Sequence, residues 1–159
     1  MPWRLRPAAL AAGMAMTVSD LIGPRQEVFS IPDDMTVYEA ARYLREKRVR
    51  TVGVRDNNGR LVGVVSQSDI SDKVAAENKC PSWMRVSEIM STDLITVTLD
   101  THLYECLHLM EQHNIYHLMV VDDKTGYCGT VSVQDLLKVI ASDEKSRADM
   151  LEAFLFQQR

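Results

Sequence analysis

Two copies of one short polar motif are the residues of this sequence best suited to chemistry. Each copy reads Gly-x-x-Ser-x-x-Asp, and the copies occupy residues 63–69 and 129–135. Both sit where a β-rich run passes into a helical pattern, and backbone N–H groups at a helix start lack partners and attract phosphate. Ser66 and Ser132 can add a donor toward the phosphate, while Asp69 and Asp135 can accept from two vicinal hydroxyls of a ribose. Phosphate plus ribose indicates a nucleotide.

The same spacing also has a purely structural interpretation. Ser-x-x-Asp at a helix start is close to a capping box, in which the two side chains satisfy each other's backbone N–H groups. A single copy would favour capping. Two copies at the same place in a duplicated unit, each preceded by a Gly that allows close approach, favour nucleotide binding.

The motif copies end a longer internal repeat. Phe29 aligns with Ile95, and the offset of 66 positions holds without a gap through both motifs. A unit of about 60 residues is marginal as a lone hydrophobic core, so we expect the two copies to pack on each other. The repeat therefore predicts one body made of two halves, in which a ligand can be bound twice.

Each repeat predicts the order strand, helix, strand, strand, helix. Thr36 and Glu39 form a capping box before an amphipathic helix, and Leu103, Cys106 and Met110 mark the buried face of its counterpart. Leu107 shares that face. The predicted elements are strands over 28–31, 49–54 and 61–65 and a helix over 68–76, then strands over 94–97, 115–121 and 128–132 and a helix from 134.

Composition limits the classes of function. The chain has 159 residues, of which 46% are hydrophobic and 25% charged, and no apolar run reaches the roughly 18 residues of a membrane span. The formal net charge of −4 gives no general attraction to nucleic acid or anionic lipid. Cys80, Cys106 and Cys128 show no Cys-x-x-Cys spacing, which fits neither a disulfide framework nor a zinc site. We expect a soluble cytoplasmic protein that binds neither nucleic acid nor membrane.

The two ends lie outside the repeats. We expect residues 1–16 to form a disordered extension; a secretory leader is the alternative, disfavoured because Pro7 and Gly13 break its short apolar patch. Residues 17–76 and 86–141 are the predicted repeats, joined by a linker over 77–85. Residues 142–159 carry apolar side chains at helical spacing, including Phe154, and predict a C-terminal helix that lies on the body or on a partner chain.

These features resemble a tandem pair of CBS domains, the cystathionine-beta-synthase-type regulatory module also called a Bateman-type module. The resemblance covers roughly residues 17–141. It rests on Val-Ser-Asp-Leu-Ile at 18–22, Val-Ser-Glu-Ile-Met at 86–90, Val-Val-Asp at 120–122 and the two Gly-x-x-Ser-x-x-Asp segments. It implies an α/β fold of two β-α-β-β-α repeats packed about a pseudo-twofold axis, with two clefts between them.

The resemblance also implies ligands and partners. Adenosine-containing molecules such as AMP, ATP, NAD or S-adenosylmethionine bind in the clefts of this family. Carried over to this sequence, Asp69 and Asp135 would hold ribose hydroxyls and Ser66 and Ser132 would face phosphate. The remaining cleft residues would be Arg50 and Tyr116, with Val28 and Leu94 touching the adenine. The expected protein is a stand-alone homodimeric regulator from a bacterium, which signals through conformation to an unknown effector protein.

Other interpretations remain open at this point. The clefts could be empty, in which case the chain would be a scaffold that pairs with an enzyme or transporter. A small enzyme acting on a nucleotide is the third possibility, although no nucleophile and base pair is indicated by position. His113 and His117 are four apart, but a helix-to-strand boundary is predicted between them, which disfavours a metal site.

Overall fold

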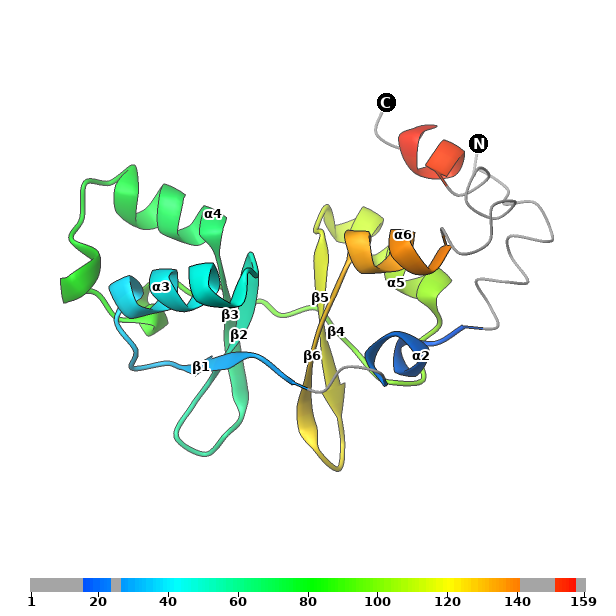
Figure 1. Ribbon diagram of the computed structural model, residues 1–159, viewed down its shortest axis with the longest axis horizontal. Coiled ribbons are helices and arrows are strands. Elements are labelled where there is room, and N and C mark those ends of the chain that lie inside the picture. Colours follow the sequence, from blue (N-terminus) through cyan, green and yellow to red (C-terminus); the bar gives the residue numbers. More distant parts are fainter. Residues whose placement is uncertain (1–15, 24–26, 141–150, 157–159) are drawn as a thin grey trace. The chain divides into compact units, whose positions relative to one another are not determined.

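The computed structural model describes residues 16–23, 27–140 and 151–156 (Figure 1). Their contacts divide the chain into two compact units. The first-repeat unit contains Gln26–Thr96 together with Val121–Thr130, the tip of the second hairpin. The second-repeat unit contains Val97–Val120 with the described parts of Met1–Arg25 and Val131–Arg159. The predicted mixed α/β fold is confirmed, because each repeat contributes a small three-stranded sheet with helices.

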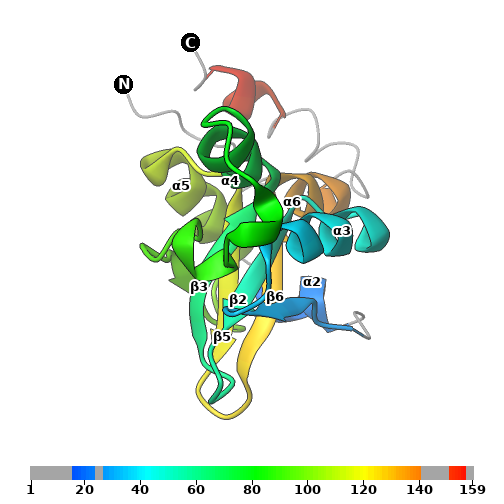
Figure 2. The ribbon, with the colours of Figure 1, turned by 90° about the vertical axis from the view of Figure 1, so that its left-hand side faces the viewer.

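The first repeat builds a sheet in the order β1-β2-β3 from Ser30–Pro32, Thr51–Arg55 and Leu61–Ser66. Strand β1 runs parallel to β2, whereas β2 and β3 form an antiparallel hairpin. The hairpin turn places Gly59 at φ 78°, a conformation that favours glycine. Figure 2 shows this unit facing the viewer, and Figure 1 shows α3 (Val37–Lys47) and α4 (Gln67–Ile70) on the same side of the hairpin. The antiparallel pairing brings the start of β2 beside the end of β3.

Helix α3 spans Val37–Lys47, and its N-terminus is the predicted capping box. The Thr36 hydroxyl accepts from the Glu39 N–H at 3.1 Å, and the Glu39 carboxylate accepts from the Thr36 N–H at 3.1 Å. Its apolar side buries Val37, Ala40 and Leu44 in a core that β2 and β3 complete. The predicted amphipathic pattern is therefore confirmed.

The helix expected over 68–76 is partly a different kind of helix. Helix α4 covers only Gln67–Ile70, and the π-helix η1 follows over Ser71–Ala75. The Ala76 N–H bonds the Ser71 carbonyl at 2.8 Å, a five-residue span that widens the turn. Short 3-10 helices follow at Pro81–Trp83 (η2) and Val86–Glu88 (η3).

The second repeat repeats the plan with β4 at Thr96–Val97, α5 at Leu103–His113, β5 at His117–Asp122, β6 at Gly126–Ser132 and α6 at Val133–Ile140. Its strand order is β4-β5-β6. Helix α5 buries the predicted set of Leu103, Cys106, Leu107 and Met110. Residues 151–156 are helical, as expected for the C-terminus. Residues 1–15 of the extension predicted over 1–16, and residues 142–150 and 157–159 of the predicted tail, lie outside the described residues.

The segment that precedes each repeat in the sequence is hydrogen-bonded to the other repeat, which the sequence repeat alone does not indicate. Helix α2, Val18–Ile22, precedes the first repeat but is hydrogen-bonded to the second, with the Val18 N–H on the Thr101 carbonyl at 2.9 Å. The segment before the second repeat instead joins the first, with the Val86 N–H on the Met35 carbonyl at 2.8 Å. Neither repeat is completed by its own continuous sequence.

Within the described residues, no helix combines the length and apolar character needed to cross a membrane.

Candidate functional site

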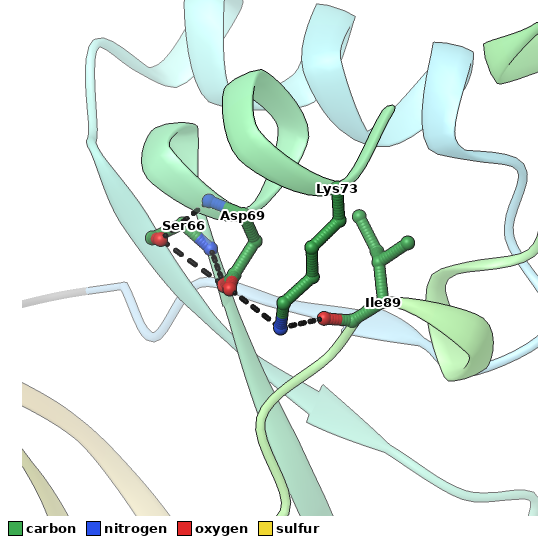
Figure 3. A network of polar contacts seen from close by, with 4 residues as sticks. All are labelled: Ser66, Asp69, Lys73 and Ile89. Atoms are coloured by element: carbon green, nitrogen blue, oxygen red, sulfur yellow. Dashed lines mark hydrogen bonds and ion pairs between the residues drawn. The ribbon is translucent and has the colours of Figure 1, made fainter. Parts of the chain in front are cut away.

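The first motif copy forms corner one, which consists of Ser66 and Asp69 where β3 passes into α4 (Figure 3). The Asp69 carboxylate oxygen Oδ2 accepts from the Ser66 N–H at 2.9 Å and from the Ser66 hydroxyl at 3.0 Å. In return, the Ser66 hydroxyl oxygen accepts from the Asp69 N–H at 3.2 Å. The motif is therefore a complete capping box, and it fixes the carboxylate in one orientation.

The second motif copy forms corner two, which consists of Ser132 and Asp135 where β6 passes into α6. The Asp135 Oδ2 accepts from the Ser132 N–H at 2.9 Å, and the Ser132 hydroxyl accepts from the Asp135 N–H at 3.1 Å. These distances agree with those of corner one to within 0.1 Å. The duplication has preserved the shape of the corner as well as its residues.

The backbone of each corner has fewer unpartnered N–H groups than the sequence argument assumed. The Gln67 N–H bonds the Arg50 carbonyl at 3.0 Å, and the Val133 N–H bonds the Tyr116 carbonyl at 3.0 Å. The N–H of each motif Asp is already used in the cap. A phosphate at either corner would thus depend on side chains more than on these helix starts.

The same hydrogen bonds place two more of the predicted site residues. Because their carbonyls accept from the residue that follows each motif Ser, Arg50 lies at corner one and Tyr116 at corner two. Both side chains are exposed. Arg50 precedes β2, whose first residue, Thr51, pairs with Ser66 across the hairpin.

The two residues expected to touch adenine lie just before the opening strands. Val28 is 43% exposed, and β1, which it precedes by two residues, pairs with β2 in parallel register from Ser30 opposite Gly53. That register extends Val28 toward Thr51, at the same end of the sheet as corner one. Leu94 is half-buried and precedes β4. The adenine contacts of both residues stay predictions.

Lys73 lies beside corner one, and the sequence reasoning missed it. Its ammonium nitrogen Nζ lies 2.9 Å from Asp69 Oδ1 and donates to the Ile89 carbonyl at 2.7 Å (Figure 3). The i,i+4 spacing from Asp69 was a usable signal, since residues four apart share a helix face. The residue equivalent to Lys73 in the second repeat is Val139.

The two motif glycines serve different needs. A Cβ on Gly63 would lie 2.5 Å from the Met90 sulfur, so its absence makes room for a partly buried side chain. Gly129 has φ 126°, a backbone conformation that favours glycine. The expected role of glycine in admitting a ligand is therefore not needed to explain Gly63.

A cavity of about 330 Å³ adjoins the start of corner two. Tyr116 and Val133 line it together with Phe154 from the C-terminal helix and residues at the end of α5. Tyr116, a predicted site residue, and Phe154, a residue of the C-terminal helix, thus line the same cavity. The lining combines apolar side chains with the polar Glu111 and Asn114.

The thiol of Cys106 and the side chains of His113 and His117 belong to α5 and β5. Burial raises the pKa of the Cys106 thiol to about 12, so this buried group stays protonated at neutral pH. Helix α5 ends at His113 and β5 begins at His117, so the predicted boundary does separate the two histidines. Among the described residues, no cluster of three or more His, Cys, Asp or Glu could hold a metal ion.

The comparison with protein families decides the relationship. A family model described as the CBS domain matches residues 18–76 and again residues 86–142. The chain belongs to the CBS-domain family. This CBS-domain chain is 34% identical over 116 residues to "Uncharacterized protein MJ1232" from Methanocaldococcus jannaschii, a match that covers 73% of this chain but 37% of that protein. The chain spans 59% of the next curated relative, MK0525 from Methanopyrus kandleri, at 30% identity.

Solved structures of the family are similar to the whole repeat pair. A CBS-domain protein from Burkholderia ambifaria has a TM-score of 0.74 at 26% identity, with 80% of this chain and 96% of that chain covered. The CBS-domain pair of protein MJ0100, in complex with 5-methylthioadenosine and S-adenosyl-L-methionine, gives 0.71 at 26% identity and covers 80% and 97%. PAE2072 from Pyrobaculum aerophilum, complexed with AMP, gives 0.68 at 26% identity and covers 76% and 89%.

Proposed function

We propose that this CBS-domain chain is a regulatory module that binds an adenosine-containing ligand at corner one, corner two or both. The observation that carries the proposal is the duplicated corner, in which each motif Asp is held in the same orientation by the same backbone bond of 2.9 Å. Similar CBS-domain proteins are complexed with AMP, S-adenosyl-L-methionine or 5-methylthioadenosine, all of which contain adenosine.

In the proposed mode of binding, the ribose hydroxyls donate to Asp69 at corner one and to Asp135 at corner two. Ser66 and Ser132 face the phosphate, Arg50 and Tyr116 border it, and Val28 and Leu94 contact the adenine. A carboxylate held by a cap is preorganised, so binding a ribose does not cost the ordering of that side chain. AMP, ATP, NAD and S-adenosylmethionine are the candidate ligands.

The proposed output is a change in shape passed to a partner. A ligand that binds one conformation of the module better shifts its population toward that conformation. We propose a cytoplasmic homodimer that presents this change to a separate effector protein and that catalyses no reaction itself.

Isothermal titration with the four candidate ligands tests the proposal, with sites counted per chain. Asp69→Asn and Asp135→Asn, made singly and together, keep the size of each side chain and remove its charge. Binding that is lost one site at a time would support the ribose assignment. An unchanged affinity in the double variant would exclude it, and turnover of the bound nucleotide would establish an enzyme instead.

A scaffold function is the second candidate, favoured by exposed apolar side chains. Trp83 is 86% exposed, and Leu155 and Phe156 are each 62% exposed. Large apolar groups on a surface often mark contacts with other proteins. Titrations in which none of the four ligands binds would favour this function.

A further inference from the structure

We infer that Lys73 makes corner one selective for adenosine ligands that carry a phosphate group, over the uncharged nucleoside. This inference rests on the proposed function and deepens it for one site. It names a specificity residue that lies outside the Ser-x-x-Asp motif.

The contacts of Lys73 define its present state. Its Nζ is shared between Asp69 Oδ1 at 2.9 Å and the Ile89 carbonyl at 2.7 Å, as Figure 3 shows. The Asp69 side chain is 14% exposed, whereas that of Lys73 is 46% exposed. The carboxylate is therefore fixed and largely covered, while the lysine keeps access to solvent and can change partner.

A ribose bound to Asp69 competes with this ion pair. Oδ2 already accepts two hydrogen bonds from Ser66, so the hydroxyls of a ligand must use Oδ1, which Lys73 occupies. An uncharged nucleoside that binds Oδ1 displaces the Lys73 ammonium group and offers it no anion in exchange. A ligand with a phosphate supplies a new anion, and the flexible four-carbon stem of a lysine lets the ammonium group turn toward it.

The surroundings of corner one add to this preference. Arg50 is held at the same corner through its carbonyl bond to Gln67, so corner one has a second cationic residue besides Lys73. The wide turn of η1, which contains Lys73, is a local departure from α-helix of a kind often found at functional sites. The equivalent residues of the second repeat, Tyr116 and Val139, carry no positive charge. Phosphate selectivity is thus assigned to corner one.

The test compares AMP with adenosine in the full chain. Titrations use an Asp135→Ala background, so that corner one is the site observed. Lys73→Gln removes the charge but keeps a donor for the Ile89 carbonyl. We expect Lys73→Gln to weaken AMP binding roughly fivefold, because a partly exposed charge pair contributes modestly, and to leave adenosine binding equal or tighter.

Two controls separate selectivity from a general charge or folding effect. Lys79→Gln removes a nearby exposed lysine of the same unit. It should leave the ratio of the affinity for AMP to the affinity for adenosine unchanged. Lys73→Arg keeps the charge and should retain the preference for AMP. Val139→Lys, measured in an Asp69→Ala background, should raise the affinity of corner two for AMP relative to its affinity for adenosine.

The outcomes are distinguishable. If Lys73→Gln changes the affinities for AMP and adenosine by the same factor, or changes neither, Lys73 is not a selectivity residue, although the proposed function stands. If the unaltered chain binds neither AMP, ATP, NAD nor S-adenosylmethionine, the proposed function fails and this inference fails with it.

Discussion

Replacing Asp69 with alanine tests whether corner one combines a structural cap with ligand binding. The carboxylate accepts two hydrogen bonds from Ser66 and forms the ion pair with Lys73. Loss of a cap costs about 1 kcal/mol, and a partly exposed ion pair adds up to about 1 kcal/mol. We therefore expect Asp69→Ala to lower the free energy of unfolding by roughly 1 to 2 kcal/mol.

Urea unfolding followed by circular dichroism measures this loss, with the slope against urea concentration checked for constancy. For a chain of this size, the melting temperature should fall by about 2 to 4 °C for each kcal/mol. Ser66→Ala is the matched control at the same corner, because it removes the cap on the Asp69 N–H and leaves the carboxylate with Lys73. Its expected cost is about 1 kcal/mol.

Binding and stability must be read together in these variants. A domain stable by about 5 to 15 kcal/mol stays folded after such a loss, so any missing ligand binding by Asp69→Ala reports the site and not unfolding. A free energy of unfolding equal to that of the unaltered chain would refute the capping argument. Retained ligand affinity at corner one would refute the ribose assignment independently.

Three further predictions concern packing, acid stability and thiol reactivity. Gly53→Ala places a Cβ 2.6 Å from the Tyr127 ring and should lower the free energy of unfolding, measured in urea, by about 1 to 3 kcal/mol. Tyr127→Leu introduces the residue found at the equivalent position of the first repeat, and in combination with Gly53→Ala it should recover much of this loss. If the effects of the two substitutions simply add, the proposed clash is wrong. Hydrogen bonds from the Thr36 backbone and hydroxyl lower the pKa of Glu39 in the folded chain below 4.5. The ionised carboxylate therefore contributes its full stabilisation above pH 4.5, and this stabilisation is lost as the pH falls through the lower pKa of the folded chain. The stability difference between the unaltered chain and Glu39→Gln should therefore shrink on acidification; a constant difference would show that the cap is not the cause. The buried Cys106, whose pKa is raised to about 12, should react with a thiol reagent only after unfolding, whereas the exposed Cys80 should react at once; equal rates in the folded chain would contradict the burial.

The sequence predicted those parts of the fold that depend on local periodicity. The cap at Thr36 and the buried face of α5 follow from spacing along a helix, and the structure confirms both. The partners of the opening segments could not be predicted, because α2 bonds residues near Thr101 while Val86 bonds Met35. Those pairings depend on tertiary structure, about which periodicity says nothing.

The site shows the same division between local and distant information. The pairing of Ser66 with Asp69 is local and could be written from the motif. The ion pair of Lys73 was available at i,i+4 spacing, but its second partner, the Ile89 carbonyl, is 16 residues away. The reason for Gly63 was likewise distant, since Met90 occupies the space that a side chain would need. A motif shared by two repeats therefore does not imply a shared reason for every residue in it.

The duplicated corners show how one backbone arrangement can carry different side chains. The backbone carbonyls of Arg50 and Tyr116 each accept a hydrogen bond of 3.0 Å from the N–H that follows the motif Ser. These bonds do not involve the side chains of Arg50 and Tyr116. Any residue with a backbone carbonyl can make that bond, so the side chain at this position can change without loss of the corner. The capping box likewise uses only Ser and Asp, which leaves the position of Lys73 and Val139 unconstrained by the cap. Shape and charge are therefore set by separate residues at each corner, and a difference in ligand between them requires no change in fold.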